Sequence, residues 1–363
     1  MASALQHVAW ESCAVEPTRD PELESYARRK MGILSPAIPY FAPVPWLARA
    51  VIDLRPEYGL LMHIDQHVVD LMTLVVSQEN SCRFCYAGTR ALLWAKGVSK
   101  ARLQDMEQQF ARTDLPATTV AAIAFGRSQS RSGPSGVHAA REALGREGFS
   151  DAQIKELAYV AAEIDFSNRA HTLPAIPARP MEELPDLWYM RLSRPLVKRL
   201  ILKSRYRGQA TPSDDLPWYP YAAILKAYAG TPIAAALRRT LDGMWASTHL
   251  TRRCKLLMLA VIARGLGCDN CEPDVTRALE HEGCDRRMLS DVLTHLNAAE
   301  LDEHEQLLVS FARETIWYKP AAVQQRARAL RSALTGPQLL EAVGVAALGN
   351  GLCRLGAMLV PQQ

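Results

Sequence analysis

The apolar residues of the chain recur with the period of an α-helix along almost its whole length. They fall every three to four positions, and no convincing run alternates apolar and polar residues as a half-buried strand does. Helix breakers such as Gly97, Pro116 and Gly230 separate the periodic segments. The pattern predicts an all-α protein.

The predicted helices form two groups. In the first group we predict helices near 40–54, 61–78, 82–96, 99–110, 116–130, 135–146 and 150–170. In the second group we predict helices near 218–229, 231–246, 250–265, 272–283, 286–296, 301–316, 320–334 and 336–352. The segment 174–217 between the groups contains prolines and polar residues, which are typical of a connection.

The two groups resemble each other in sequence when they are aligned on two pairs of cysteines. Cys268 and Cys271 follow Cys82 and Cys85 at a constant offset of 186 residues, with the surrounding apolar positions largely in step. The same offset relates His63 to His249 and Phe125 to Phe311. A register held over about 100 residues indicates a diverged tandem duplication. We predict a first helical unit over 1–185, a basic linker over 186–216 and a second unit over 217–363.

Composition and charge place the chain among ordinary globular proteins. Its 363 residues are 48% hydrophobic and 22% charged, and the formal net charge of +4 gives no argument for nucleic-acid binding. The N-terminus shows no basic segment followed by an apolar core, and no apolar run approaches the roughly 20 residues that span a bilayer. We expect a soluble, cytoplasmic protein with no transmembrane segment and no nucleic-acid partner.

The linker carries a concentrated positive charge. Between 191 and 207 it has seven basic residues and no acidic one. A solvated linker helix, packed on the two units by its apolar side, accounts for this pattern. Contact with an anionic membrane surface or an acidic partner is the functional alternative.

Four of the eight cysteines fall in C-x-x-C pairs, which in a reducing compartment indicate redox or metal chemistry. In the first pair, Asn80 and Ser81 are good N-cap residues directly before Cys82. A helix N-terminus and the charge of Arg83 favour the reactive thiolate. One thiol of the pair can then attack a peroxide or disulfide while the other closes an intramolecular disulfide.

The second pair is less suited to this chemistry. Asp269 places a negative charge between Cys268 and Cys271, which disfavours the thiolate. Pro273 fits the first turn of a helix, so we predict that this helix starts after Cys271. The second pair is therefore a secondary redox candidate, either a disulfide or a weaker thiol switch.

The first cysteine pair and the apolar helix before it resemble the alkylhydroperoxidase D-like, or carboxymuconolactone decarboxylase, superfamily. The resemblance rests on the pattern S-x-x-N-x-C-x-[FY]-C, read at Ser77, Asn80, Cys82, Phe84 and Cys85. It covers the first unit well, the second weakly and the linker not at all. It implies an all-helical fold that is commonly oligomeric, with two copies packed as a dimer. A tandem chain could supply that dimer internally. Whether the chain also forms a homo-oligomer is left open.

The resemblance also implies roles for the two thiols. Family peroxidases attack hydroperoxide with the second cysteine of the pair, here Cys85, and resolve the product with the first, here Cys82. Some members are re-reduced by a dihydrolipoyl or thioredoxin-like partner.

The chain departs from this family in the proton relay beside the cysteines. Family peroxidases carry a glutamate twelve residues before the first cysteine and a histidine four residues after the second, where this chain has Asp70 and Thr89. His63, His67 and Asp70 follow the spacing i, i+4, i+7 and would project from one helix toward the thiols. We predict that Asp70 with His67 relays the proton of Cys85. The alternative is that His63 only packs and His67 is partly exposed.

These residues predict a thiol-dependent peroxidase or disulfide oxidoreductase that acts on a small hydroperoxide or disulfide, and no cofactor is predicted. Two alternatives stay open for the function of the chain. One is a decarboxylase-like enzyme of aromatic catabolism, a branch of the superfamily that does not require a C-x-x-C pair. Another is a non-catalytic redox-sensing or scaffold protein, since Thr89 replaces the family histidine. For the thiols themselves, inert packing and a zinc site that adds His63 and His67 are the alternatives.

Overall fold

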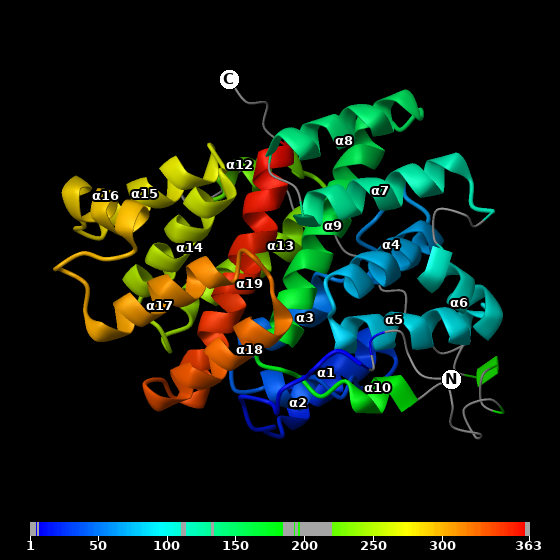
Figure 1. Cartoon of the computed structure of the whole chain (residues 1–363), viewed down its shortest axis with the longest axis horizontal. Helices are drawn as coiled ribbons and strands as arrows, with labels where there is room; N and C mark the ends of the chain where they lie inside the picture. The colour runs from blue at the N-terminus through cyan, green and yellow to red at the C-terminus, as the bar shows by residue number, and fades with distance from the viewer. Residues whose placement is uncertain are drawn as a thin grey trace.

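A computed structural model describes residues 7–109, 114–131, 134–183 and 220–359, together with residues 5, 192, 195 and 196. Within these ranges every regular element is a helix and none is a strand (Figure 1). The prediction of an all-α protein is confirmed.

The helices before the linker are α1 (Pro21–Met31), α2 (Ile38–Phe41), α3 (Pro45–Asp53), η1 (Pro56–Tyr58), α4 (Gln66–Glu79), α5 (Arg83–Lys96), α6 (Lys100–Gln109), α7 (Ala117–Arg131), α8 (Pro134–Arg146), α9 (Asp151–Thr172) and α10 (Arg179–Glu183). Those after it are α12 (Ala222–Ala227), α13 (Pro232–Ala246), α14 (Arg252–Leu266), α15 (Cys271–His281), α16 (Arg286–His295), α17 (Glu303–Glu314), α18 (Pro320–Ala329), η4 (Leu330–Ser332) and α19 (Gly336–Leu359).

Side-chain caps define several of these ends. Ser150 and Gln153 form a capping box at the start of α9, in which each side chain accepts the other's backbone N–H. Asp65 accepts the N–H of His67 and so starts α4. The predicted helix over 61–78 therefore begins too early, and His63 lies in the loop before α4. Most of the predicted linker over 186–216 lies outside the described residues.

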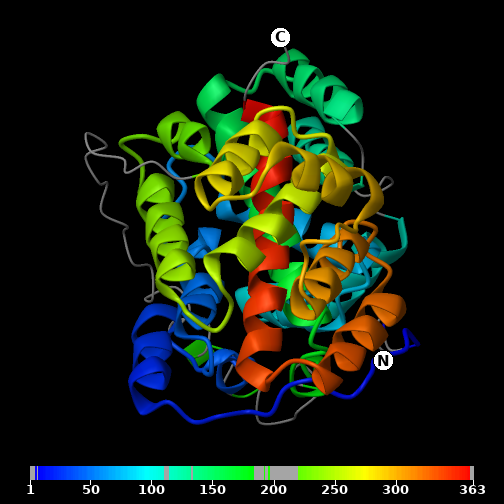
Figure 2. The same ribbon diagram turned by 90° about the vertical axis from the view of Figure 1, so that its left-hand side faces the viewer.

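α9 and α19 pack against each other at the centre of the molecule, and the other helices surround this pair (Figures 1 and 2). The helices α4 to α8 lie on one side and α14 to α17 on the other (Figure 1). A Cβ added at Gly351 of α19 would lie 2.8 Å from the carbonyl oxygen of Ala162 in α9. Glycine is therefore what allows the two helix backbones to approach so closely.

A buried charge cluster joins the two central helices. The carboxylate of Asp165 in α9 lies 3.1 Å from Arg169 of the same helix and 3.1 Å from Arg354 of α19. Ser130 of α7 donates to the same carboxylate at 2.8 Å, and Arg169 also donates to the carbonyl oxygen of Thr315. One buried carboxylate thus faces two buried guanidinium groups.

α19 is the one described helix that is long and apolar enough to span a bilayer by length and composition alone. The prediction that no segment approaches this length is wrong for α19. However, 89% of its most apolar stretch is buried inside the molecule, as in the core helix of many soluble proteins. Its Glu341 pairs with the buried Lys255 of α14 at 2.5 Å. The absence of a membrane span and the cytoplasmic location both stay predictions.

Candidate functional site

Cys82 and Cys85 lie in the sharp turn from α4 into α5. The N–H of Cys82 donates to the carbonyl oxygen of Ser77 at 3.0 Å, and Ser81 adopts φ +54°, a conformation uncommon outside glycine. The sulfur of Cys82 accepts the N–H of Cys85 at 3.3 Å and so acts as the N-cap of α5. The predicted caps were wrong, because Asn80 ends α4 and the first cysteine itself begins α5.

Cys85 opens on a small cavity, whereas Cys82 is completely buried. The cavity has a volume of about 50 Å³, and the Cys85 thiol donates to the carbonyl oxygen of Ser167 at 3.7 Å. Thr89, one turn along α5, lines the same space. The full lining is Arg55, Glu57, Thr73, Phe84, Cys85, Gly88, Thr89, Glu163, Ile164, Ser167, Asn168 and His171.

One face of α9 supplies the polar wall of this cavity. Glu163, Ser167 and His171 follow each other at intervals of four residues, which places them on one side of the helix. Glu163 exposes only 8% of its surface, and burial raises the pKa of its carboxyl group to about 8. The positive charge of Arg55 opposes this shift without cancelling it. A large share of Glu163 is therefore protonated at neutral pH.

His171 is held rigidly at the other end of this wall. Its Nδ1 lies 2.7 Å from the carbonyl oxygen of Ser167, and since that oxygen only accepts, Nδ1 carries the hydrogen. The ring stacks on Phe84 with the centroids 4.5 Å apart and meets Phe41 edge-on. Burial lowers the pKa of His171 to about 4, so the ring is neutral at physiological pH.

The environment of Cys85 does not favour the thiolate. Burial is the largest of the effects that raise the pKa of Cys85 well above its usual value, and the hydrogen bond with Cys82 and the charge of Glu163 add to it. The prediction that the helix N-terminus and Arg83 would lower this pKa was therefore wrong for Cys85. Arg83 instead forms a two-pronged ion pair with Glu182 of α10, at 2.9 and 2.8 Å.

Asp70 and His67, the predicted proton relay, lie further toward the start of α4. The hydrogen bond from Cys82 to Ser77 marks the level of the dithiol on that helix. At 1.5 Å per residue, Asp70 lies about 10 Å and His67 about 15 Å before this level along the helix axis. Asp70 is bound by Lys96 and Gln66, and His67 is exposed. Among the described residues, the wall of the Cys85 cavity includes neither of them, so their relay role stays a prediction.

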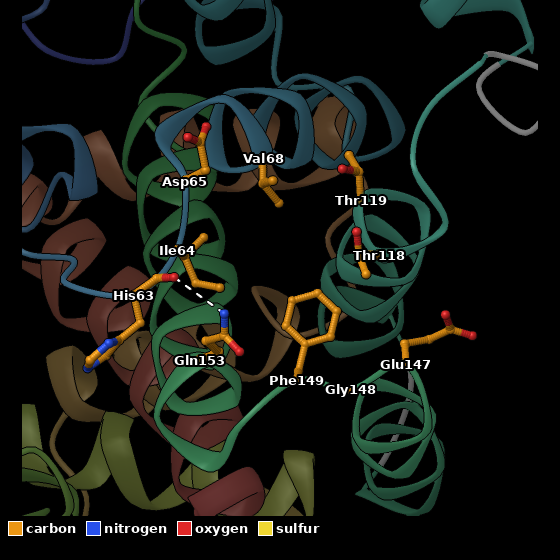
Figure 3. A pocket seen from close by; sticks show the side chains of 10 residues that line it. All are labelled: His63, Ile64, Asp65, Val68, Thr118, Thr119, Glu147, Gly148, Phe149 and Gln153. Atoms are coloured by element: carbon orange, nitrogen blue, oxygen red, sulfur yellow. Dashed lines mark hydrogen bonds between the residues drawn. The ribbon is translucent and has the colours of Figure 1, made fainter.

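His63 borders a different depression, an open groove of about 270 Å³ between the starts of α4, α7 and α9 (Figure 3). Its carbonyl oxygen accepts from Gln153 at 3.5 Å, while its imidazole points away from the groove (Figure 3). Its backbone N–H donates to Glu156 at 2.9 Å. The predicted helical face that joins His63 to His67 and Asp70 is absent.

A second, more apolar pocket of about 140 Å³ adjoins the cavity of Cys85. The two spaces share four lining residues, Arg55, Glu57, Phe84 and Gly88. Carbon-rich side chains such as those of Met31, Leu34 and Leu92 line the outer pocket. The outer pocket therefore lies next to the cavity of Cys85 and shares part of its wall.

Cys268 and Cys271 form a disulfide, which leaves no free thiol in the second pair. Both sulfurs are buried at the start of α15 against α19, where a Cβ at Gly356 would lie 2.7 Å from the sulfur of Cys271. α15 begins at Cys271, close to the predicted start. The secondary redox role of this pair stays a prediction, and a disulfide is one of the two forms predicted for it from the sequence.

The groups on α9 that face Cys85 were not among the site residues predicted from the sequence. Glu163 and His171 follow Cys85 by about 80 residues, and nothing in their spacing points to a cysteine. A weaker signal was present: α9 is rich in alanine and apolar residues, yet carries titratable side chains on the face that is otherwise buried. A buried titratable residue within an apolar helix is a candidate for function.

The chain matches no protein-family model, and no similar protein was found among curated proteins or solved structures. Within the described part of the chain, no cluster of three or more histidine, cysteine, aspartate or glutamate side chains could hold a metal ion.

Proposed function

We propose that the chain is a thiol-dependent oxidoreductase that reduces a small hydroperoxide or disulfide through Cys85 and Cys82. One observation carries this proposal: Cys85 opens on a cavity while the sulfur of Cys82 lies directly behind it, 3.3 Å from the Cys85 nitrogen. An attacking thiol and a resolving thiol need this arrangement, in which one is accessible and the other is close and protected.

The chemistry proceeds in two balanced steps. The Cys85 thiolate attacks the terminal oxygen of a hydroperoxide, breaks the O–O bond and becomes a sulfenic acid, while the alkoxide takes up a proton and leaves as an alcohol. The Cys82 thiol then attacks the sulfenic sulfur and releases water, which closes the disulfide. A dithiol reductant of the dihydrolipoyl or thioredoxin-like kind restores both thiols by exchange.

The proposal agrees with the resemblance of the first cysteine pair to the alkylhydroperoxidase D-like superfamily, and we propose that the two halves of the chain form an internal pseudo-dimer of such units. Its support is the pairing of α9 with α19, the last helices of the two predicted groups. Both helices carry a buried asparagine, and Asn168 accepts from Ser77 as Asn350 donates to Thr315. An experimental structure whose halves do not superpose by a rotation near 180° would contradict it.

Consumption of tert-butyl hydroperoxide by the purified chain, with dihydrolipoate as the added reductant, tests the activity. We expect turnover in the wild type, none in Cys85→Ser, and unchanged turnover in the matched control Cys268→Ser/Cys271→Ser. Mass spectrometry after one equivalent of peroxide should show a new Cys82–Cys85 disulfide. Slow oxidation spread over several cysteines, without turnover, would refute the proposal.

A redox-sensing role is a second candidate, favoured by the position of Arg83. This residue lies between the two thiols and holds α10 through Glu182, and it also donates to the carbonyl oxygen of Val8 at 3.2 Å. Oxidation at either side of Arg83 would strain this connection. A sensor would be oxidised once per chain without turnover, and cleavage near α10 by a protease would become faster.

A further inference from the structure

Glu163 is a buried polar residue beside Cys85 whose role the packing of the fold does not explain. Its carboxyl group accepts no hydrogen bond from the described residues, although 92% of the residue is buried. One side of Glu163 lines the cavity of Cys85, and the other borders a small apolar void beside Leu237, Leu348 and Leu352. Burying a carboxyl group without a partner is costly, so such a group points to a function within the cavity.

Cys85 needs a proton acceptor in the same cavity, because burial holds its thiol in the protonated form. The other ionisable groups of the wall are poorly placed for this task. Arg55 is engaged in an ion pair with Glu57, and it stays charged. His171 donates its Nδ1–H to the carbonyl oxygen of Ser167, and burial makes its ring a weak base. The ion pair with Arg55 also holds Glu57, so among the described residues of the wall Glu163 is the carboxyl group with no hydrogen bond or ion pair.

We propose that Glu163 takes the proton of the Cys85 thiol and returns it to the leaving alkoxide of the peroxide. This inference deepens the proposed function and rests on it. In the first step the S–H bond breaks, its proton passes to the Glu163 carboxylate, and the thiolate sulfur bonds to the terminal peroxide oxygen. The O–O bond then breaks, and the same proton moves from Glu163 to the departing oxygen, so the carboxylate is regenerated.

The size of the cavity and the acidity of Glu163 both suit this transfer. A volume of about 50 Å³ has room for a water molecule that bridges the carboxyl group and the thiol. A carboxyl pKa of about 8 lies near the ambient pH, where one group can both accept and release a proton. The usual carboxyl pKa near 4.5 would make Glu163 a far weaker base.

The other charged or titratable groups around Glu163 explain why its acidity is set where it is. Burial is the largest effect that raises the pKa of Glu163; the charge of Arg55 opposes it, and the charge of Glu57 adds to it. The groups that face Glu163 are Arg55, Glu57 and Tyr58 from the loop and η1, Cys85 from α5, and Tyr159 and His171 from α9 itself. Any change of rate with pH must be separated from the titration of these groups.

The rate at which iodoacetamide alkylates Cys85, measured by peptide mass spectrometry across pH 6 to 10, tests the inference without any peroxide. The comparison is between wild type, Glu163→Gln, Glu163→Asp and the exposed control Glu147→Gln. At neutral pH we expect Glu163→Gln to slow alkylation by about 100-fold, the lower end of what a positioned base contributes. We expect partial recovery in Glu163→Asp and no effect in Glu147→Gln.

The sign of the effect separates this role from simple electrostatics. The negative charge of Glu163 raises the pKa of Cys85, so a mere neighbouring charge predicts that Glu163→Gln speeds alkylation. Equal or faster alkylation in Glu163→Gln, with unchanged circular dichroism, would overturn the inference. A slow variant in a chain that shows no peroxide turnover would instead support the proton acceptor and refute the peroxidase.

Discussion

The buried cluster of Asp165, Arg169 and Arg354 predicts a strong asymmetry between two substitutions. Asp165→Asn keeps the shape of the side chain and can keep the hydrogen bond from Ser130. It removes the single carboxylate that neutralises two buried guanidinium groups, each 3.1 Å away. Arg354→Met removes one of the two positive charges and leaves the other paired. We therefore expect the first change to be far more destabilising than the second.

The expected magnitudes follow from the cost of burying charge. Removing one partner of a buried ion pair typically lowers the free energy of unfolding by about 3–5 kcal/mol. Asp165→Asn leaves two buried guanidinium groups, those of Arg169 and Arg354, without a carboxylate. Burial lowers the pKa of the Arg354 guanidinium from its usual value to about 10. One pKa unit corresponds to 1.36 kcal/mol, so the fold disfavours this charge by about 3 kcal/mol. Relief of that cost offsets the lost contacts, and Arg354→Met should change stability by about 1 kcal/mol or less.

Urea unfolding, followed by circular dichroism at neutral pH, measures both changes. With a slope of about 3 kcal/mol per molar urea, Asp165→Asn should lower the midpoint by about 1 M or more. Arg354→Met should leave the midpoint nearly unchanged. Two results would refute the view that Asp165 neutralises both guanidinium groups. One is an equal loss of stability in the two variants, and the other is a loss below about 1 kcal/mol for Asp165→Asn.

Two further predictions concern packing and pH. Gly351→Ala places a Cβ 2.8 Å from the backbone oxygen of Ala162 and should lower the free energy of unfolding by about 1–3 kcal/mol. In Gly145→Ala the new Cβ meets nothing within 4 Å, so this change should raise it by about 0.5–1 kcal/mol. Thermal unfolding measures both changes. Because the pKa of Glu163 is raised from 4.5 to about 8 by folding, its contribution of up to about 5 kcal/mol is complete below pH 4.5 and is lost as pH rises through 8. The pKa of His171 is lowered from 6.5 to about 4, so its contribution of about 3 kcal/mol is present above pH 6.5 and is lost as pH falls through 4. In urea unfolding from pH 4 to 9, Glu163→Gln should lose the decline in stability between pH 4.5 and 8. A decline that persists unchanged in this variant would contradict the assignment.

Much of the helical order could be predicted from the sequence, because helix period and breakers are local properties. The ends were less predictable where a cap competes with the apolar pattern, as Asp65 does at the start of α4. The site was predicted only in part. The C-x-x-C spacing identified the two thiols. Their surroundings were not predictable in this way, because Arg83 pairs with Glu182, almost 100 residues away, and the wall that faces Cys85 comes from α9. Such contacts depend on how helices pack, which one sequence does not reveal.

α9 presents Glu163 to Cys85 on one face and packs against α19 through Ala162 and its neighbours on another. The half of the chain after the linker therefore helps to shape a cavity to which it contributes no sulfur. Cutting the protein to its first 185 residues would uncover an apolar face of α9 along most of its length. A fragment without α19 would lose the helix that packs most extensively on α9. An inactive fragment of this kind would therefore show that α9 has lost its packing partner, and it would not show where the chemistry takes place.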